Sequence, residues 1–325
     1  MNAPADPGIA RSRRRRLLSE ATTRAALASV ATALLLLALK GYAAWQTSSV
    51  ALLGSLADSG LDLLASLVTL YGVRLAATPA DHDHRFGHGK AEALAALFQV
   101  ALISASALAI GWRGVSALAD PQPVEAAGIG IAVSAAAIAA TMLLVAYQRR
   151  VIAATGSVAV KADSVHYQGD ILLNLAVIAA LLLDRYAGVL GADAVFGLAI
   201  AAWLGWGAFK ASAQAIDELM DKEWPETERQ DYLAVAAGAH PELRGIHDFR
   251  TRRAGNRSFA QFHMVVAREM SVAEAHDVVE AVESELHTRF PRVEVLIHLD
   301  PEGHVDTDDP LVEEDVTPHW FRKRI

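Results

Sequence analysis

The chain of 325 residues contains no cysteine, which excludes disulfide bonds and thiolate metal ligands. It also lacks the motifs of two classes of membrane enzyme. An intramembrane metalloprotease needs HExxH, in which the glutamate is the base, whereas this chain has HYQGD from His166 to Asp170. An ATP-driven pump needs a phosphate loop of the form GxxxxGK[ST], and the sequence has none. We therefore expect a protein that is not an enzyme.

Basic stripes of the kind that bind nucleic acid are also few. The formal net charge is -8, with the positive charge concentrated near the N-terminus and an acidic excess after about Ile216. A nucleic-acid-binding protein needs clustered Lys and Arg to neutralise phosphates. The sequence therefore predicts no nucleic-acid partner.

Apolar residues, in contrast, are abundant and occur in long runs. The chain is 53% hydrophobic with a mean hydropathy of +0.26, which is high for a soluble protein of this size. Runs of about 20 apolar residues are long enough to cross a hydrocarbon layer about 30 Å thick. We expect six transmembrane helices near 25–45, 50–76, 91–118, 124–147, 158–183 and 189–210. Together they would form an α-helical membrane domain over 25–210.

The basic residues of the connecting segments predict the orientation. Residues 1–24 form a basic tail with RSRRRR at Arg11–Arg16, and the 74–90 and 148–157 loops are also basic. The other connections contain one basic residue, Arg185. The positive-inside rule then places both termini in the cytoplasm, with the protein in the cell (inner) membrane. The tail is not read as a signal peptide, because the apolar run that follows it is too long.

A soluble domain is expected after the last apolar run. Hydropathy falls after Lys210, and a charged linker over 211–224 leads to Pro225. The pattern predicts helix 226–238, strand 245–253, strand 258–267, helix 272–289 and strand 293–299. Helix, two strands, helix and strand make a small α+β domain that resembles the ferredoxin-like plan. We expect this domain to span 225–301 and a polar, acidic tail to follow over 302–325.

Two pairs of ionisable residues lie inside the apolar runs. Asp58 and Asp62 are four residues apart in the second run, and His166 and Asp170 are four apart in the fifth, so each pair shares one helix face. At about 1.5 Å per residue, both pairs reach the middle of the membrane. One buried aspartate can be protonated or bonded to a nearby serine, but two matched pairs favour a shared cation. Asn174 continues the second face, either behind the ligands or in ordinary helix packing.

The ligand types indicate which cation is bound. Three carboxylates and one imidazole in a tetrahedral arrangement suit Zn²⁺, with Cd²⁺, Fe²⁺ or Co²⁺ as alternatives. The imidazole disfavours Mg²⁺ and Ca²⁺, which prefer oxygen ligands only. A second candidate metal site is the loop with Asp81, His84 and His88, whose spacing lets three side chains face one ion. The alternative for this loop is a solvated polar turn.

Several motifs resemble the cation diffusion facilitator family, in its bacterial zinc, cadmium and ferrous-iron efflux branch. They are ADSGLD in the second run, DHDHRFGHGKAE after it, KADSVHYQGD in the fifth run and the histidines of the C-terminal domain. The resemblance covers about 20–300. It implies that the second and fifth helices are adjacent and share a transport site made of Asp58, Asp62, His166 and Asp170.

The resemblance also implies further sites and a dimer. A metal would bind in the loop, and a two-metal site would lie at a cytoplasmic dimer interface. The ligands carried over for that interface are His247, His263, His276, His298 and Asp300. A pair formed by Lys90 and Asp221 would link the spans to the soluble domain and across the dimer.

The function expected from these features is metal efflux. We expect a homodimeric Zn²⁺/H⁺ antiporter in the lipid bilayer that expels metal from the cytosol by alternating access. Buried ligands hold protons when no metal is bound, and metal binding displaces those protons. The alternatives are a membrane metal sensor and a facilitated-diffusion carrier without proton coupling.

Overall fold

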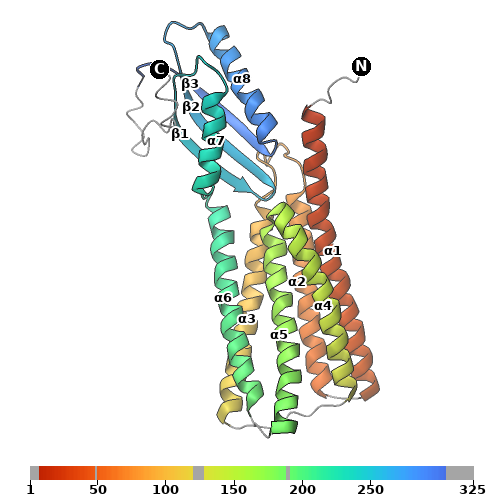
Figure 1. Ribbon diagram of the computed structural model, residues 1–325. Helices are drawn as coiled ribbons and strands as arrows, with labels where there is room; N and C mark the ends of the chain where they lie inside the picture. Colours follow the sequence, from red (N-terminus) through yellow and green to blue (C-terminus); the bar gives the residue numbers. More distant parts are fainter. Residues whose placement is uncertain (1–6, 48–49, 120–127, 188–190, 305–325) are drawn as a thin grey trace. The chain divides into compact units, whose positions relative to one another are not determined.

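The computed structural model describes residues 7–47, 50–119, 128–187 and 191–304 (Figure 1). It divides into two compact units, of which one is Leu17–Asp217 and the other contains the chain before Leu17 and from Glu218 onward. Each unit is described separately. The predicted tail beyond residue 304 lies outside the described residues.

The first unit is built from six long helices. They are α1 (Pro7–Thr47), α2 (Val50–Ala76), α3 (Ala91–Ala119), α4 (Gly128–Thr155), α5 (Val158–Ala187) and α6 (Ala192–Leu219). In the part of the chain that the structure describes, five helices are long and apolar enough to cross a membrane, and α5 is not among them. The first half of α5 carries Lys161, Asp163, His166 and Asp170. Three boundaries differ clearly from the prediction. Helix α1 begins at Pro7 and includes much of the expected tail, α4 ends at Thr155 instead of 147, and α6 ends at Leu219 instead of 210 and includes much of the expected linker.

Small residues let these helices approach closely. A Cβ atom on Gly72 of α2 would lie 2.4 Å from the Cβ of Ala95 on α3, and one on Gly169 of α5 would lie 2.6 Å from Leu204 Cδ2 on α6. Both distances are far below van der Waals contact, so a larger residue at Gly72 would push α3 away, and one at Gly169 would displace the Leu204 side chain. Helix α5 also packs against α2, α3 and α4. Gly169 thus fixes the close approach of α6 directly beside Asp170.

The second unit is the predicted small α+β domain. Its elements are α7 (Glu226–Gly238), β1 (Gly245–Ala254), β2 (Arg257–Val266), α8 (Val272–Arg289) and β3 (Val293–Pro301). The sheet order is β1-β2-β3, with β1 antiparallel and β3 parallel to β2. Helix α7 contacts β1 and α8, and α8 contacts β3, so the two helices pack beside the sheet (Figure 1). All five predicted elements are present.

The core of this domain explains why the chain folds this way. Tyr232 of α7, Phe262 and Met264 of β2, and Val282 and Leu286 of α8 are almost completely buried in one cluster. On each helix the buried residues recur every three or four positions, and on β2 they alternate, as amphipathic elements require. Helix α8 is started by a capping box between Ser271 and Glu274.

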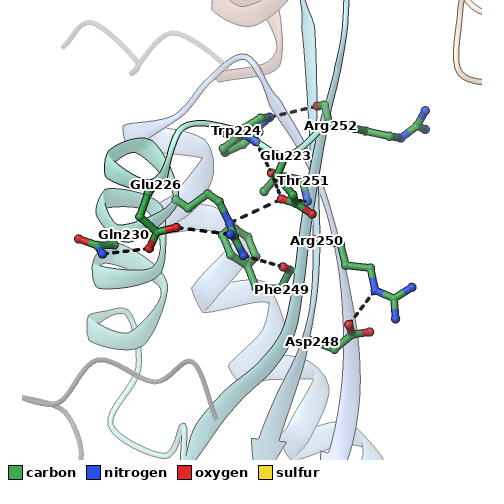
Figure 2. A network of polar contacts seen from close by, with 10 residues as sticks. Glu223, Trp224, Glu226, Gln230, Asp248, Phe249, Arg250, Thr251 and Arg252 are labelled. Carbon is green, nitrogen blue, oxygen red and sulfur yellow. Dashed lines mark hydrogen bonds and ion pairs between the residues drawn. The ribbon is translucent and has the colours of Figure 1, made fainter. Parts of the chain in front are cut away.

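The residues that enter the domain are fixed to β1. The backbone N–H of Trp224 donates to Thr251 Oγ1 at 2.9 Å, and its indole N–H donates to the carbonyl of Arg252 at 3.1 Å (Figure 2). Glu223 accepts from the backbone N–H of Thr251 at 3.0 Å. The segment just before α7 is therefore part of the folded domain and not a free linker.

Candidate metal centres

The structure brings one acidic residue of α2 beside two ligand-type residues of α5. His166 Nε2 lies 2.9 Å from Asp62 Oδ1 and 3.8 Å from Asp170 Oδ2. The three side chains are 11%, 18% and 25% exposed for His166, Asp62 and Asp170, so all three are shielded by the bundle. The predicted adjacency of α2 and α5 is thus observed. Where the cluster lies, the two helices contact each other through the ionisable side chains of Asp62 and His166.

This cluster has the dimensions of a zinc site. One ligand atom from each of Asp62, His166 and Asp170 lies within 4.8 Å of the others. With Zn–N and Zn–O bonds of about 2.0–2.2 Å, ligand atoms of a tetrahedral site lie roughly 3.4 Å apart. Small side-chain rotations of the three residues would therefore bring them onto one ion.

Asp58 is not part of this cluster. It was expected as the fourth ligand, but it is exposed and lies outside the group of three. Asp58 and Asp62 are four residues apart on α2 and so share a face of that helix, but only Asp62 has a described contact with His166. In this structure the cluster therefore contains three residues that could bind one ion, and the role of Asp58 stays a prediction.

Asn174 contacts the backbone behind the cluster. Its side-chain Nδ2 donates to the carbonyl of Asp170 at 2.8 Å. The contact is one turn along the same helix and does not involve the Asp170 carboxylate. A role for Asn174 in orienting the ligand side chain stays a prediction.

The loop between α2 and α3 forms a second cluster. Asp81 Oδ1 lies 3.4 Å from His84 Nδ1, Asp81 Oδ2 lies 3.5 Å from His88 Nε2, and the two imidazole rings are 4.4 Å apart. The three ligand atoms lie within 4.8 Å of one another. All three residues predicted for the loop are therefore close together. His82 is not in the group.

Backbone donors hold the Asp81 carboxylate in place. Its Oδ1 accepts from the N–H of His84 at 2.6 Å and from the N–H of Asp83 at 3.0 Å. The hydrogen bond from the His84 backbone, more than any other contact, lowers the pKa of Asp81 below its usual value. Gly87, at φ 80, turns the chain so that His88 returns toward Asp81. The loop therefore presents an ionised carboxylate beside two imidazoles.

The third cluster lies on the sheet of the C-terminal domain. His247, His263 and His298 are register partners across β1, β2 and β3, so they form one row. Asp300 follows His298 by two residues and returns to the same face. Its Oδ2 lies 2.8 Å from His263 Nδ1 and 3.3 Å from His247 Nε2, and its Oδ1 lies 3.5 Å from His298 Nε2.

This carboxylate is the centre of the row. The Asp300 side chain is 4% exposed, whereas that of His298 is 65% exposed at the open edge. A nearly buried carboxylate surrounded by three imidazoles has the ligand types of a zinc site, and its two oxygens face different histidines. One carboxylate with that geometry can serve two ions.

Within the single chain that the structure describes, His276 lies outside the third cluster, and its expected role at a dimer interface stays a prediction. It lies on α8, where the buried residues are Ala275, Val278, Val282 and Leu286. Its position is off that buried face, so its imidazole is exposed and pairs with Glu280 at 3.4 Å.

Sequence reasoning missed two side chains of the third cluster. Asp248 Oδ2 lies 3.7 Å from His263 Nε2, and His304 Nε2 lies 4.0 Å from Asp300 Oδ1. Strand alternation would place Asp248 opposite His247. Instead the register shifts between His247 and Arg250, and Asp248 takes φ 47, which turns its side chain toward the histidines. A β-bulge of this kind leaves no simple sequence signal.

Asp248 is itself held by a neighbour. Arg250 Nε donates to Asp248 Oδ1 at 2.7 Å (Figure 2).

Asp221, the other non-glycine residue with positive φ in the described part of the chain, pairs with Arg252 Nη1 at 3.6 Å. Asp221 and its predicted partner Lys90 belong to different units. The Lys90–Asp221 link therefore stays a prediction.

The apolar bundle and the three clusters define a multi-pass membrane protein with metal-coordinating groups inside the bundle and outside it. Comparisons with known proteins agree. The model of the cation efflux transmembrane domain matches residues 26–220, and that of the cation efflux protein cytoplasmic domain matches residues 225–302. The chain therefore belongs to the cation diffusion facilitator family of cation efflux transporters.

Individual relatives cover most of the chain. The cation-efflux pump FieF of Cronobacter sakazakii is 44% identical over 279 residues, which are 86% of this chain and 92% of that protein. FieF of Klebsiella pneumoniae is 42% identical over 283 residues, 87% of this chain and 94% of that protein. Among solved structures, the metal-bound C-terminal domain of the CzcD transporter from Thermotoga maritima is 29% identical. It covers 26% of this chain and 100% of that chain, with a TM-score of 0.24.

Proposed function

We propose that the chain is a homodimeric Zn²⁺/H⁺ antiporter that exports divalent metal from the cytosol, with Cd²⁺, Fe²⁺ and Co²⁺ as alternative cargoes. The observation that carries this proposal is the convergence of Asp62, His166 and Asp170 from two neighbouring helices. The relatives are cation-efflux pumps, which supports export. The imidazole favours Zn²⁺ over Mg²⁺ and Ca²⁺.

Proton exchange follows from the chemistry of the ligands. Close carboxylates in surroundings of low dielectric cannot all remain ionised, so without metal the cluster retains protons. The contact of 2.9 Å between His166 Nε2 and Asp62 Oδ1 is a position for one of them. A metal ion needs the deprotonated forms of all ligands, so binding and proton release are linked. Opening the site to each side of the membrane in turn then exchanges metal for protons.

We propose that the protein lies in the inner membrane of the cell. Both termini and the C-terminal domain then lie in the cytoplasm. The basic loops support this orientation, because the loops on the opposite side have few basic residues. The loop cluster of Asp81, His84 and His88 then lies on the cytoplasmic side. There its carboxylate and imidazoles would bind metal near the entrance from the cytosol.

The C-terminal domain would bind regulatory metal ions and form the dimer. Asp300 would hold these ions together with His247, His263 and His298, and metal bound there supplies a cross-link between the strands. The exposed His298 and the distant His276 would complete the site across the interface, each facing a second copy of this chain. Metal that binds the dimer better in one transport state shifts the equilibrium toward that state. The Lys90–Asp221 pair would link the domain to the spans.

The test is metal uptake by purified protein in liposomes with an imposed pH gradient. An antiporter moves Zn²⁺ faster when protons run down their gradient in the opposite direction, and dissipation of the gradient removes the increase. Transport that is equal with and without the gradient would overturn the antiport and leave a facilitated-diffusion carrier. Charge reversal at Lys90 and Asp221 together should restore what either single reversal removes.

A further inference from the structure

A buried carboxyl group outside the metal ligands lies on α5. Asp163 is 1% exposed, and its Oδ2 lies 2.6 Å from Ser29 Oγ of α1 and 2.8 Å from Gln148 Nε2 of α4. Gln148 Nε2 also donates to Ser29 Oγ at 3.0 Å, so the three side chains form a closed triangle. Ser29 and Gln148 are fully buried. Nothing in the metal clusters accounts for a carboxyl group at this place.

A second polar contact joins this triangle to α2. The Tyr167 hydroxyl donates to the carbonyl of Ser29 at 3.1 Å and lies 2.9 Å from Ser66 Oγ. His166 and Tyr167 each lie three or four residues from both Asp163 and Asp170, so the four residues follow one side of α5. Asp163 is nearer the start of the helix, on the side of the basic loop. It therefore lies between the transport cluster and the proposed cytoplasmic end of α5.

Two acceptor atoms of this triangle have no donor in the described part of the chain. Asp163 Oδ1 and Gln148 Oε1 are buried acceptors without a hydrogen-bond partner among the described residues. The donors that face Asp163 both go to Oδ2, and neither of them is charged. A carboxylate in hydrocarbon without a cationic partner is costly. A proton on Oδ1 removes that charge and leaves both hydrogen bonds to Oδ2 in place.

We propose that Asp163 is a proton-binding site of the transport cycle, separate from the metal ligands, that is protonated when the transport site is empty and ionised when it holds metal. The inference rests on the proposed antiport. Residues one turn apart on a helix have Cβ atoms roughly 6 Å apart, so a divalent ion at His166 lies within strong electrostatic range of Asp163. The O–H bond of the acid then breaks, and the proton passes to water on the cytoplasmic side.

The groups that face Asp163 allow this response. On its own helix they are His166, Tyr167 and Asp170, and on α2 the nearest is Asp62. Among the described residues of α1 and α4, Ser29 and Gln148 are those that contact it, and neither titrates. Glu92 of α3 contacts Ser157 at the start of α5. Of the charges near Asp163, the charge of the transport cluster is therefore the one that changes when metal binds.

The test counts protons released when Zn²⁺ binds to the purified full-length protein in a weakly buffered solution. Asn in place of Asp163 keeps the shape and the acceptor for Gln148 but cannot release a proton. We expect Asp163→Asn to release about one proton fewer per Zn²⁺ at the transport site than the wild type. Ser29→Ala is the matched control, because it removes a member of the triangle and leaves the acid. Its count should equal that of the wild type.

The outcomes separate this inference from the antiport. An Asp163→Asn protein that releases as many protons as the wild type would overturn the inference, because Asp163 would then only hold helices together. Wild-type transport that ignores a pH gradient would overturn the antiport itself. If Asp163→Asn does not fold, infrared difference spectra of the wild type and Asp163→Glu decide. A carboxylic-acid band that disappears on Zn²⁺ binding and shifts in the Glu variant supports the proposal, and an identical band in both contradicts it.

Discussion

His166 Nε2 of α5 lies 2.9 Å from Asp62 Oδ1 of α2, a contact between residues that are 104 positions apart in the chain. It joins the two helices at the level of the transport cluster. Both side chains are mostly buried, so the contact is largely protected from solvent screening. The relative position of α2 and α5 should therefore change when a metal ion replaces this direct contact.

The first prediction compares the two aspartates of α2. Asp62→Asn should lower Zn²⁺ affinity at the transport site by roughly 100-fold, because it removes a charged ligand that directly faces His166. Asp58→Asn should lower the affinity less if three protein ligands are enough. It should have an equally large effect if Asp58 turns inward when metal binds. Calorimetric titration of both variants in detergent distinguishes the two cases.

The second prediction concerns metal selectivity. His166→Asp replaces the single nitrogen ligand by oxygen, and an all-oxygen site suits Mn²⁺ better than Zn²⁺. We expect Zn²⁺ transport to fall and Mn²⁺ transport to rise in liposomes that are assayed with each ion separately. Tyr167→Phe, which changes the adjacent residue, serves as the control and should keep the wild-type preference. An unchanged ratio of the two ions in His166→Asp would contradict the role of the imidazole.

The third prediction concerns the loop cluster and pH. The pKa of Asp81 is lowered by its hydrogen bond from the backbone of His84, so this carboxylate stays ionised well below neutral pH. Asp81→Asn should therefore weaken metal binding at the loop by a similar factor at every pH between about 5 and 7. Binding of Cd²⁺ to the full chain, measured across that range, checks this. An effect that vanishes at the acid end would show that Asp81 was already protonated there.

The fourth prediction concerns the start of α8. Hydrogen bonds from Ser271 lower the pKa of Glu274. A group whose pKa is lower in the folded state stabilises that state above its unfolded pKa of about 4.3, and this is lost as the pH falls through the folded value. Ser271→Ala should cost about 1 kcal/mol at neutral pH and less in acid.

Hydrogen exchange of the α8 amides in the intact protein measures this difference, after correction for intrinsic rates. Ser284→Ala, at an exposed position in the middle of the same helix, is the control. It should leave exchange at the first turn unchanged. Equal protection in Ser271→Ala and wild type at neutral pH would show that the capping box does not stabilise the helix.

The fifth prediction concerns the third cluster. Asp300→Asn should remove metal binding by the C-terminal domain, because its carboxylate faces three histidines. His276→Ala should have little effect on the ligands within one chain and should weaken metal-dependent dimerisation. Sedimentation of the full-length protein with and without Zn²⁺ measures both. A His276→Ala dimer as stable as the wild type in metal would remove this residue from the interface.

The sequence was a good guide where one regular element decides the geometry. The spacing of His166 and Asp170 on α5, and the positions of the strands that carry His247, His263 and His298, follow from helix and strand periodicity. It was a poor guide where a side chain depends on a tertiary contact or an irregular backbone. Asp58 shares a helix face with Asp62 and yet lies outside the cluster.

Asp248 and Asp163 show two further limits. The side chain of Asp248 is turned by a bulge with positive φ, and strand alternation cannot anticipate it. Asp163 was inside a predicted span, but its partners Ser29 and Gln148 come from helices that are distant in sequence. Only the packing of α1, α4 and α5 brings these three residues together.

The central claim is that metal crosses the membrane through the space between α2 and α5. It is tested most directly by Zn²⁺ transport into liposomes that contain purified wild-type protein, beside identical liposomes that contain Asp62→Ala. We predict that the wild type accumulates Zn²⁺ and that Asp62→Ala stays at the background of protein-free liposomes while its C-terminal domain still binds metal. Transport by Asp62→Ala at the wild-type rate would contradict the account.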